Sequence, residues 1–284
     1  HTTLQKSDLL ISIGHNIREK PPFIPKDGDQ PLIHINFTPA DISHIYHPHL
    51  EIIGDIAVTV TSLSNEIVPA AHWDFSYFYQ VRNYLNDQIK KEESVKSFPV
   101  KPQHFVAALQ KTTSKESIIA LDNGMYKIWL TRNFRAISQH HVLVDNALAT
   151  MGAGLPSAIV AKLVYPNRPV IAVCGDGGFM MSIAELETAK RLGLNLTILI
   201  LNDNGFGMVK WKQKEAGFSD FGLSYTNPDF TALAKSFSVN GFRLMKNENL
   251  EEKLQTCLKT PGITVFEIPI DYSENATLLR EDVL

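Results

Sequence analysis

The sequence contains little cysteine, with only Cys174 and Cys257 in 284 residues. Two distant thiols cannot form a disulfide framework, and they lack the close spacing of metal ligands. This indicates a reducing compartment, and we expect the cytoplasm. No basic and then apolar leader follows His1, so no signal peptide is predicted. A chain that starts without Met is expected to begin partway through a longer protein.

The sequence also lacks any strong excess of charge and any long apolar run. It has 27 Lys and Arg against 30 Asp and Glu, a net charge of −3. Bulk charge therefore gives no reason to expect binding to nucleic acid or to an anionic membrane. The longest apolar run, around 196–201, has the length of a strand and is far shorter than the roughly 20 residues of a membrane span. We expect no nucleic-acid partner and no membrane.

The pattern along the chain is that of an α/β protein with parallel sheets. Short apolar runs at 8–14, 31–37 and 50–55 predict strands buried on both faces, and 56–67 predicts a helix. Three strands are few for a parallel sheet, so we predict only part of a Rossmann-like middle domain over 1–70. An amphipathic, charged helix over 73–98 precedes Pro99 and Pro102, and we therefore place a helical linker at 71–102.

The third predicted domain, 103–284, alternates strands with helices. Such alternation is typical of a parallel sheet with helices on both faces, with ligands beyond the carboxyl ends of the strands. The predicted strands are 117–122, 141–145, 169–174, 194–202, 241–245 and 262–269. The predicted helices are 103–112, 153–164, 182–192, 229–237 and 248–258.

Two of these strands end in acidic residues and glycine. Gly-Asp-Gly-Gly occupies 175–178, and Asp-Asn-Gly-Phe-Gly occupies 203–207. One helical crossover connects the two strands, so the strand ends should lie side by side. Asp176 and Asp203 would supply carboxylate oxygens and Gly205 a backbone carbonyl, a ligand set that suits Mg²⁺. Because glycines and a helix start favour a nearby phosphate, the pattern predicts a magnesium–diphosphate site.

This spaced pair resembles the signature of thiamine-diphosphate enzymes, which begins with Gly-Asp-Gly and ends in an Asn-Asn-type pair. Here 27 positions separate Asp176 from Asp203, and Asp203 replaces the second Asn. Catabolic acetolactate synthases tend to carry Asp at that position, and either residue supplies an oxygen. The resemblance covers nearly the whole chain and is sharpest from 145 to 213. It implies thiamine diphosphate and Mg²⁺ as cofactors, with FAD not favoured.

Other segments resemble further parts of the acetolactate synthases. Segment 146–152 is similar to the one that holds the cofactor bent, which implies Met151 as the wedge and the Ala149 carbonyl facing the aminopyrimidine. Segment 121–125 resembles the loop over the diphosphate, and 207–213 the helix over the substrate, which implies a catalytic role for Gln213. The residues that the resemblance places at the cofactor are Asn123, Gly124, Met125, Ala149, Met151, Gly175, Asp176, Gly177, Gly178, Asp203, Gly205, Phe206, Gly207 and Met208.

The resemblance implies decarboxylation of pyruvate, or a related 2-oxo acid, and its ligation to a second pyruvate to give 2-acetolactate for branched-chain amino acid biosynthesis or a catabolic role. The activating glutamate of the family lies on an N-terminal domain, and no segment here is similar to it. A missing N-terminal half and a second subunit would therefore complete the active site, in a homodimer or homotetramer. We expect residues 1–284 alone to be inactive.

Alternatives remain for several motifs. Gly152-Ala-Gly154 before a helix is similar to a dinucleotide fingerprint, which would indicate an NAD-binding oxidoreductase. Close packing of that helix on the sheet is the favoured explanation of these glycines. His44, His47 and His49 could bind zinc, but no further ligand completes the set and solvated histidines are favoured. A non-catalytic cofactor-fold domain is the last alternative, against which the two retained carboxylates argue.

Overall fold

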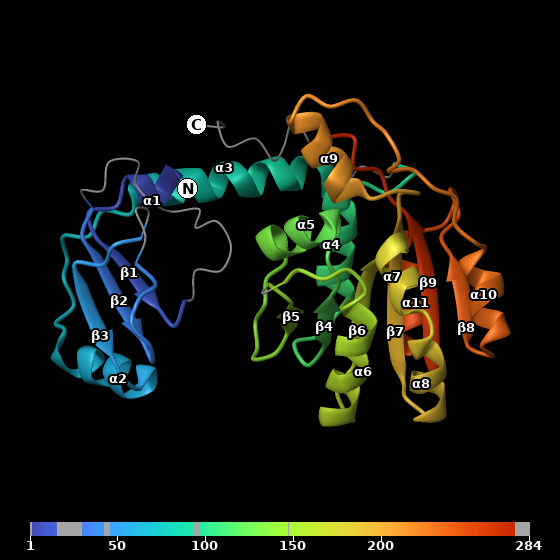
Figure 1. Ribbon diagram of the computed structural model, residues 1–284, viewed down its shortest axis with the longest axis horizontal. Coiled ribbons are helices and arrows are strands. Elements are labelled where there is room, and N and C mark those ends of the chain that lie inside the picture. Colours follow the sequence, from blue (N-terminus) through green and yellow to red (C-terminus); the bar gives the residue numbers. More distant parts are fainter. Residues whose placement is uncertain (1, 16–29, 43–45, 94–96, 147, 276–284) are drawn as a thin grey trace. The chain divides into compact units, whose positions relative to one another are not determined.

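The computed structural model describes residues 2–15, 30–42, 46–93, 97–146 and 148–275. His44, Ala147 and the residues after 275 therefore lie outside the described part, although sequence predictions fall on them. The chain divides into two compact units, one within 1–87 and one within 88–280. Each unit is built around its own parallel sheet (Figure 1).

The first unit has a three-stranded parallel sheet in the order β1-β2-β3, with a small core that includes Leu10, Leu32 and Tyr46. Asp55 is the N-cap of helix α2, and its carboxylate accepts a hydrogen bond from the Val58 N–H at 2.9 Å. An acidic N-cap of this kind satisfies an amide that has no partner within the helix. The elements are α1 (Thr2–Gln5), β1 (Leu10–Ile13), β2 (Leu32–Asn36), β3 (Leu50–Ile53), α2 (Ile56–Glu66) and then α3 (Ser76–Glu93).

The second unit has a six-stranded sheet in the order β5-β4-β6-β7-β9-β8, and every pair of neighbours is parallel. In Figure 1 its strands can be followed from β5 in green to β8 in orange. The strands are β4 (Ile118–Leu121), β5 (Val142–Val144), β6 (Val170–Gly175), β7 (Leu196–Asn202), β8 (Asn240–Arg243) and β9 (Ile263–Pro269). All six lie within three residues of their predicted positions.

Helices cover both faces of this sheet, which confirms the predicted fold class. One core lies under α4 (Pro102–Thr112), α5 (Met125–Asn133) and α11 (Leu250–Lys259). The other lies under α6 (Gly154–Val164), α7 (Asp176–Ser182), α8 (Glu185–Arg191) and α10 (Phe230–Ser236). Helix α9 (Gly207–Glu215) packs Met208 and Trp211 against the first core.

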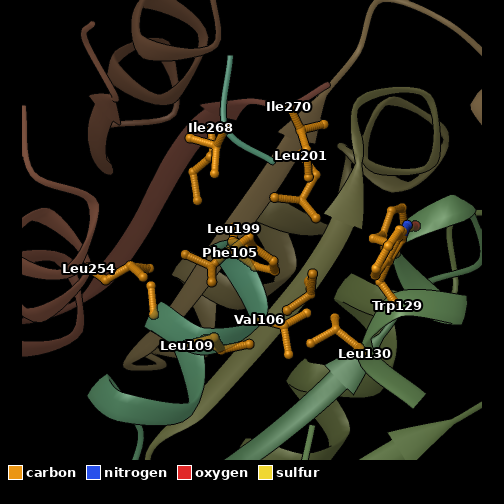
Figure 2. Close-up of a cluster of buried hydrophobic side chains, with 14 of the residues drawn as sticks. Phe105, Val106, Leu109, Trp129, Leu130, Leu199, Leu201, Leu254, Ile268 and Ile270 are labelled. Carbon is orange, nitrogen blue, oxygen red and sulfur yellow. The ribbon is translucent and has the colours of Figure 1, made fainter. Parts of the chain in front are cut away.

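Alternate residues of each strand enter the two cores, which explains the continuous apolar runs. Leu199 and Leu201 of β7 pack in the core beneath α4, shown in Figure 2, whereas Ile198 and Ile200 pack beneath the helices of the other face. Phe105 of α4 is 1% exposed. Burying a side chain of this size contributes about 1.5–3 kcal/mol, so both layers hold the central strands firmly.

Two helix predictions were incomplete. The single helix expected over 182–192 is two helices, and α7 already begins at Asp176. The glycines at 177–178 have a low helix propensity and argue locally against a helix. Phe179 is nevertheless 0% exposed, and its burial stabilises the helix there. Helix α5 was missed, although Met125, Trp129 and Leu130 form the buried face that a periodic pattern would have shown.

Among the described helices, none has both the length and the apolar composition needed to cross a bilayer.

Candidate functional site

The two acidic strand ends are neighbours. β6 pairs directly with β7, and Gly175 is in register with Leu201. Asp176 and Asp203 therefore leave adjacent parallel strands at the same edge of the sheet. The predicted juxtaposition of the two strand ends is confirmed. It follows because one crossover through α7 and α8 connects the two parallel strands, and such connections are right-handed.

Asp176 is buried and firmly held. It is 1% exposed. Its Oδ1 accepts hydrogen bonds from the Gly177 N–H at 2.9 Å and from the Tyr225 hydroxyl at 3.0 Å. Its Oδ2 accepts one from the Asn227 side-chain amide at 2.7 Å. Such outer contacts fix the orientation of a carboxylate that binds a metal.

Asp203 lies in an environment that disfavours its charge. Burial, and then the nearby Asp176, raise its pKa to about 7, although Lys210 opposes the shift. Its Oδ2 lies only 2.6 Å from the place where a Cβ on Gly207 would be, so the carboxylate lies against the start of α9. Two neighbouring carboxylates that repel each other form a site that a cation would stabilise.

The Gly205 carbonyl completes the predicted ligand set. The Tyr225 hydroxyl lies 3.3 Å from the Gly205 oxygen and 3.0 Å from Asp176 Oδ1, so one atom reaches both groups. Burial raises the pKa of Tyr225, and Asp176 and Asp203 raise it further. In the described part of the chain no three His, Cys, Asp or Glu side chains gather as metal ligands. Two carboxylates and a carbonyl nevertheless fit Mg²⁺, which takes its other ligands from water and phosphate.

A hydrogen-bond network supports the turn after β7. Asn202 donates from its amide to Glu267 Oε1 at 2.8 Å, and its Oδ1 accepts from the Asn204 N–H at 3.0 Å. The Asn227 amide bridges Asn202 Oδ1 at 3.0 Å and Asp176 Oδ2. Asn204 has φ +54°, a conformation that Asn tolerates better than most residues. The network therefore joins both strand ends.

Sequence reasoning missed three members of this network: Tyr225, Asn227 and Glu267. Tyr225 and Asn227 lie in the long connection before α10, where no periodic pattern and no glycine motif marks them. Glu267 is 2% exposed within β9. The one available signal was this acidic residue inside an otherwise apolar strand, because a buried charge requires a partner.

The glycines at 177 and 178 are required by close packing. A Cβ on Gly177 would lie 2.5 Å from the Tyr225 hydroxyl, 3.1 Å from Phe206 Cε1 and 3.4 Å from Met151 Cε. A Cβ on Gly178 would collide with Asp122 Oδ2. The structure thus brings the predicted residues Met151, Phe206 and Gly177 together beside Asp176.

The Met151 segment forms a strained turn. Ala149 has φ +49° and Gly152 has φ +87°, and a Cβ on Gly152 would lie 3.1 Å from Met181 Cβ. The Asn123 amide donates to the Thr150 carbonyl at 2.8 Å. The predicted loop at 121–125 and the predicted wedge segment are therefore in direct contact.

Other predicted site residues are placed differently. The Met125 side chain is 2% exposed in the core, so only its backbone could face a cofactor, and Gly124 lies against the Tyr126 ring. Met208 packs toward the core from α9. Gln213, also on α9, has a buried Oε1 for which the described part of the chain offers no hydrogen-bond partner. Its proposed catalytic role stays a prediction.

Close packing explains the glycines that are similar to a dinucleotide fingerprint. A Cβ on Gly154 would lie 2.7 Å from Asp122 Cβ and 2.9 Å from Cys174 Sγ. The expectation that a glycine lets the helix approach the sheet is therefore confirmed for Gly154, whereas Gly152 lies against Met181 of α7. Cys174 is fully buried, and burial raises the pKa of its thiol well above the usual value.

Fold and site together define an α/β protein with two acidic residues and a glycine-rich turn at the carboxyl ends of a parallel sheet, the edge where such folds bind ligands. The family model described as "Thiamine pyrophosphate enzyme, C-terminal TPP binding domain" matches residues 122–268. The chain belongs to this family of thiamine pyrophosphate enzymes.

Curated relatives support the same assignment. The chain is 31% identical over 281 residues to acetolactate synthase of Bacillus subtilis, covering 98% of this chain and 49% of the relative. It is 33% identical over 285 residues to the catabolic acetolactate synthase of Raoultella terrigena, covering 98% and 50%. The isozyme 2 large subunit of Escherichia coli is 27% identical over 280 residues, covering 96% and 49%. The chain therefore spans about half the length of these relatives.

Proposed function

We propose that this chain carries the diphosphate- and magnesium-binding part of an enzyme that decarboxylates pyruvate and ligates the product to a second pyruvate, giving 2-acetolactate. The observation that carries the proposal is the pair of carboxylates at neighbouring strand ends. Asp176 and Asp203 lie close enough for one to raise the pKa of the other, and the Tyr225 hydroxyl reaches both Asp176 and Gly205. The similarity to acetolactate synthases supports this choice of reaction.

Asp176, Asp203 and the Gly205 carbonyl would hold Mg²⁺, and the glycines at 177–178 would admit the diphosphate to the start of α7. Bound thiamine diphosphate supplies the carbon nucleophile, and the protein supplies orientation and electrostatics. Met151 would keep the cofactor bent. Its Cε lies 3.4 Å from a Cβ position on Gly177, next to the proposed diphosphate site. Positioning of this kind can contribute about 7–11 kcal/mol in well-oriented cases.

Completion of the active site would require groups outside residues 1–284. The relatives are about twice as long as this chain. The proposal therefore includes an activating glutamate from the other half of such an enzyme and a second subunit, in a homodimer or homotetramer. Residues 1–284 alone would then bind magnesium and diphosphate weakly and form no acetolactate. Acetolactate formation by these residues alone would contradict this part of the proposal.

The test is a reaction of the protein as it is encoded, with ¹³C-labelled pyruvate, thiamine diphosphate and Mg²⁺, followed by NMR. The proposal predicts labelled acetolactate and its loss when magnesium is chelated. Cofactor-dependent release of carbon dioxide without acetolactate would retain the site and change the acceptor. Turnover that is indifferent to chelation would contradict the metal assignment. Adding FAD in a parallel reaction should change nothing, since a flavin is not favoured.

A further inference from the structure

Two adjacent side chains at the end of β4 hold the backbone on both sides of Met151. The Asn123 amide donates to the Thr150 carbonyl at 2.8 Å, one residue before Met151. The Asp122 carboxylate accepts from the Ala153 N–H at 3.1 Å, two residues after it. Together they fix the path of the chain that presents this methionine.

Asp122 is built into this position. It is 0% exposed, and its Oδ1 also accepts from the Asn123 N–H at 2.8 Å. Burial raises its pKa, and the N–H groups of residues 123, 152, 153 and 154 oppose that shift. The backbone donors to Oδ1 replace water, whereas the buried Oδ2 has no hydrogen-bond partner among the described residues.

The surrounding residues leave no room for another arrangement. Cβ atoms on Gly154 and on Gly178 would both collide with Asp122, so two glycines from different helices accommodate its side chain. These glycines belong to α6, which follows the Met151 turn, and to α7, which begins with Asp176. Asp122 thus links the turn to the proposed diphosphate site.

A lysine fixes the second side chain. The Lys127 ammonium donates to Asn123 Oδ1 at 2.7 Å and to the Asp145 carbonyl at 2.7 Å. Asp145 Oδ2 accepts from the Thr150 N–H at 3.3 Å. The Asn123 side chain is therefore oriented at both ends, with its oxygen toward Lys127 and its nitrogen toward Thr150. We call Asp122, Asn123 and Lys127 the β4 latch.

We propose that Asp122 is a positioning residue for the reaction, acting through the β4 latch to set the height and direction of Met151 under the bound cofactor. The inference rests on the proposed function, because it requires a cofactor above Met151. Asp122 itself touches the turn and not the cofactor. Anchoring of the diphosphate falls to Asp176, Asp203 and Gly205, so loss of the latch should affect turnover more than affinity.

The principal variant is Asp122→Ala in the protein as it is encoded. It removes the Oδ1 atom that accepts from the Asn123 and Ala153 N–H groups, so both lose this acceptor. We expect kcat at saturating cofactor to fall ten- to hundredfold, the effect of a small misplacement of a positioning group. The Kd for thiamine diphosphate with Mg²⁺, measured by calorimetry, should change less than threefold. Hydrogen exchange at the Ala153 N–H should become faster.

Lys127→Met serves as a second variant if Asp122→Ala does not fold, because Lys127 is only half-buried. It should lower kcat in the same direction, by at least threefold. Ile119→Val is the matched control. It lies on the same strand at 0% exposure and lowers stability without touching the latch. Its kcat and Kd should stay within twofold of the original protein.

Two outcomes contradict the proposal and can be told apart. If Asp122→Ala, or Lys127→Met in its place, leaves kcat as high as Ile119→Val does, the positioning role is wrong and the proposed function stands. The same holds if the variant raises Kd in proportion to the loss of kcat. If the unmodified protein binds no thiamine diphosphate with Mg²⁺, the proposed function fails and the positioning role fails with it.

Discussion

Asp122 is a buried and Asp203 a half-buried aspartate, each directly after a strand of the six-stranded sheet, and loss of solvent raises the pKa of each. Their surroundings differ. Asp122 faces backbone N–H groups, which oppose the shift. Asp203 faces a second carboxylate, Asp176, which increases it. Backbone donors partly satisfy the Asp122 carboxylate within the protein, whereas a neighbouring carboxylate offers no donor, and a cation beside Asp176 and Asp203 would stabilise both charges. The first arrangement suits a structural link and the second a metal site.

Replacing Asp176 should have the largest effect on activity, because it removes one of the two neighbouring carboxylates. Asp176→Ala removes one proposed metal ligand and one acceptor each of Tyr225 and Asn227, which keep Gly205 and Asn202 as partners. We expect acetolactate formation to fall to background at any Mg²⁺ concentration, as measured in steady-state assays. Unchanged turnover would refute the metal assignment. Ile171→Val on the preceding strand β6, buried but remote from the strand end, provides the control.

A smaller effect is expected from Tyr225→Phe. The variant removes the hydroxyl that joins Asp176 Oδ1 to the Gly205 carbonyl and keeps the ring that packs against Phe206. Outer contacts of this kind change metal affinity by about 10–100-fold, so the Mg²⁺ concentration for half-maximal activity should rise at least tenfold. Tyr165→Phe, which removes a hydroxyl elsewhere in the same unit, should leave it unchanged. Equal values for both variants would exclude Tyr225 from the site.

The close packing around Asp122 can be tested by measuring the free energy of unfolding. In Gly154→Ala the new methyl would overlap Asp122 and Cys174, which are held by β4 and β6. Overpacking of this degree costs about 1–3 kcal/mol in the free energy of unfolding, measurable by chemical denaturation. Ser157→Ala, one turn along α6, should cost less than about 0.5 kcal/mol, as surface substitutions do. Equal stability of both variants would contradict the tight packing around Asp122.

The smallest effect concerns pH. Because the pKa of Asp203 is raised to about 7, a proton competes with the metal below that pH. Apparent Mg²⁺ affinity should fall as the pH decreases from 7 to 6 and level off above 8. Asp203→Asn keeps an oxygen ligand without a titration, so its affinity should vary less over this range. In the metal-free protein, the raised pKa means that this group's contribution to stability decreases as the pH rises from about 4 to 7. A pH-independent affinity in the original protein would contradict the shift.

The central sheet and the paired strand ends could be predicted because apolar runs and glycine-flanked acids are local features of the sequence. Asp176 and Asp203 were found for this reason. The supporting contacts could not be predicted, since Tyr225 and Asn227 reach the site through an irregular connection. Asp122 was overlooked within the segment 121–125, because its role depends on amides about 30 residues away. Sequence spacing identifies acidic residues at the ends of strands. Tertiary packing decides which of their carboxylates receive hydrogen bonds within the protein.

The most direct test of the metal assignment is calorimetric titration of the protein, as it is encoded, with thiamine diphosphate, first with Mg²⁺ and then with a chelator. If Asp176, Asp203 and Gly205 hold Mg²⁺, binding of thiamine diphosphate should weaken at least tenfold on chelation. In Asp176→Ala the affinity should be the same with and without the chelator. Equally tight binding with and without the metal would show that Asp176, Asp203 and Gly205 do not hold a magnesium–diphosphate group.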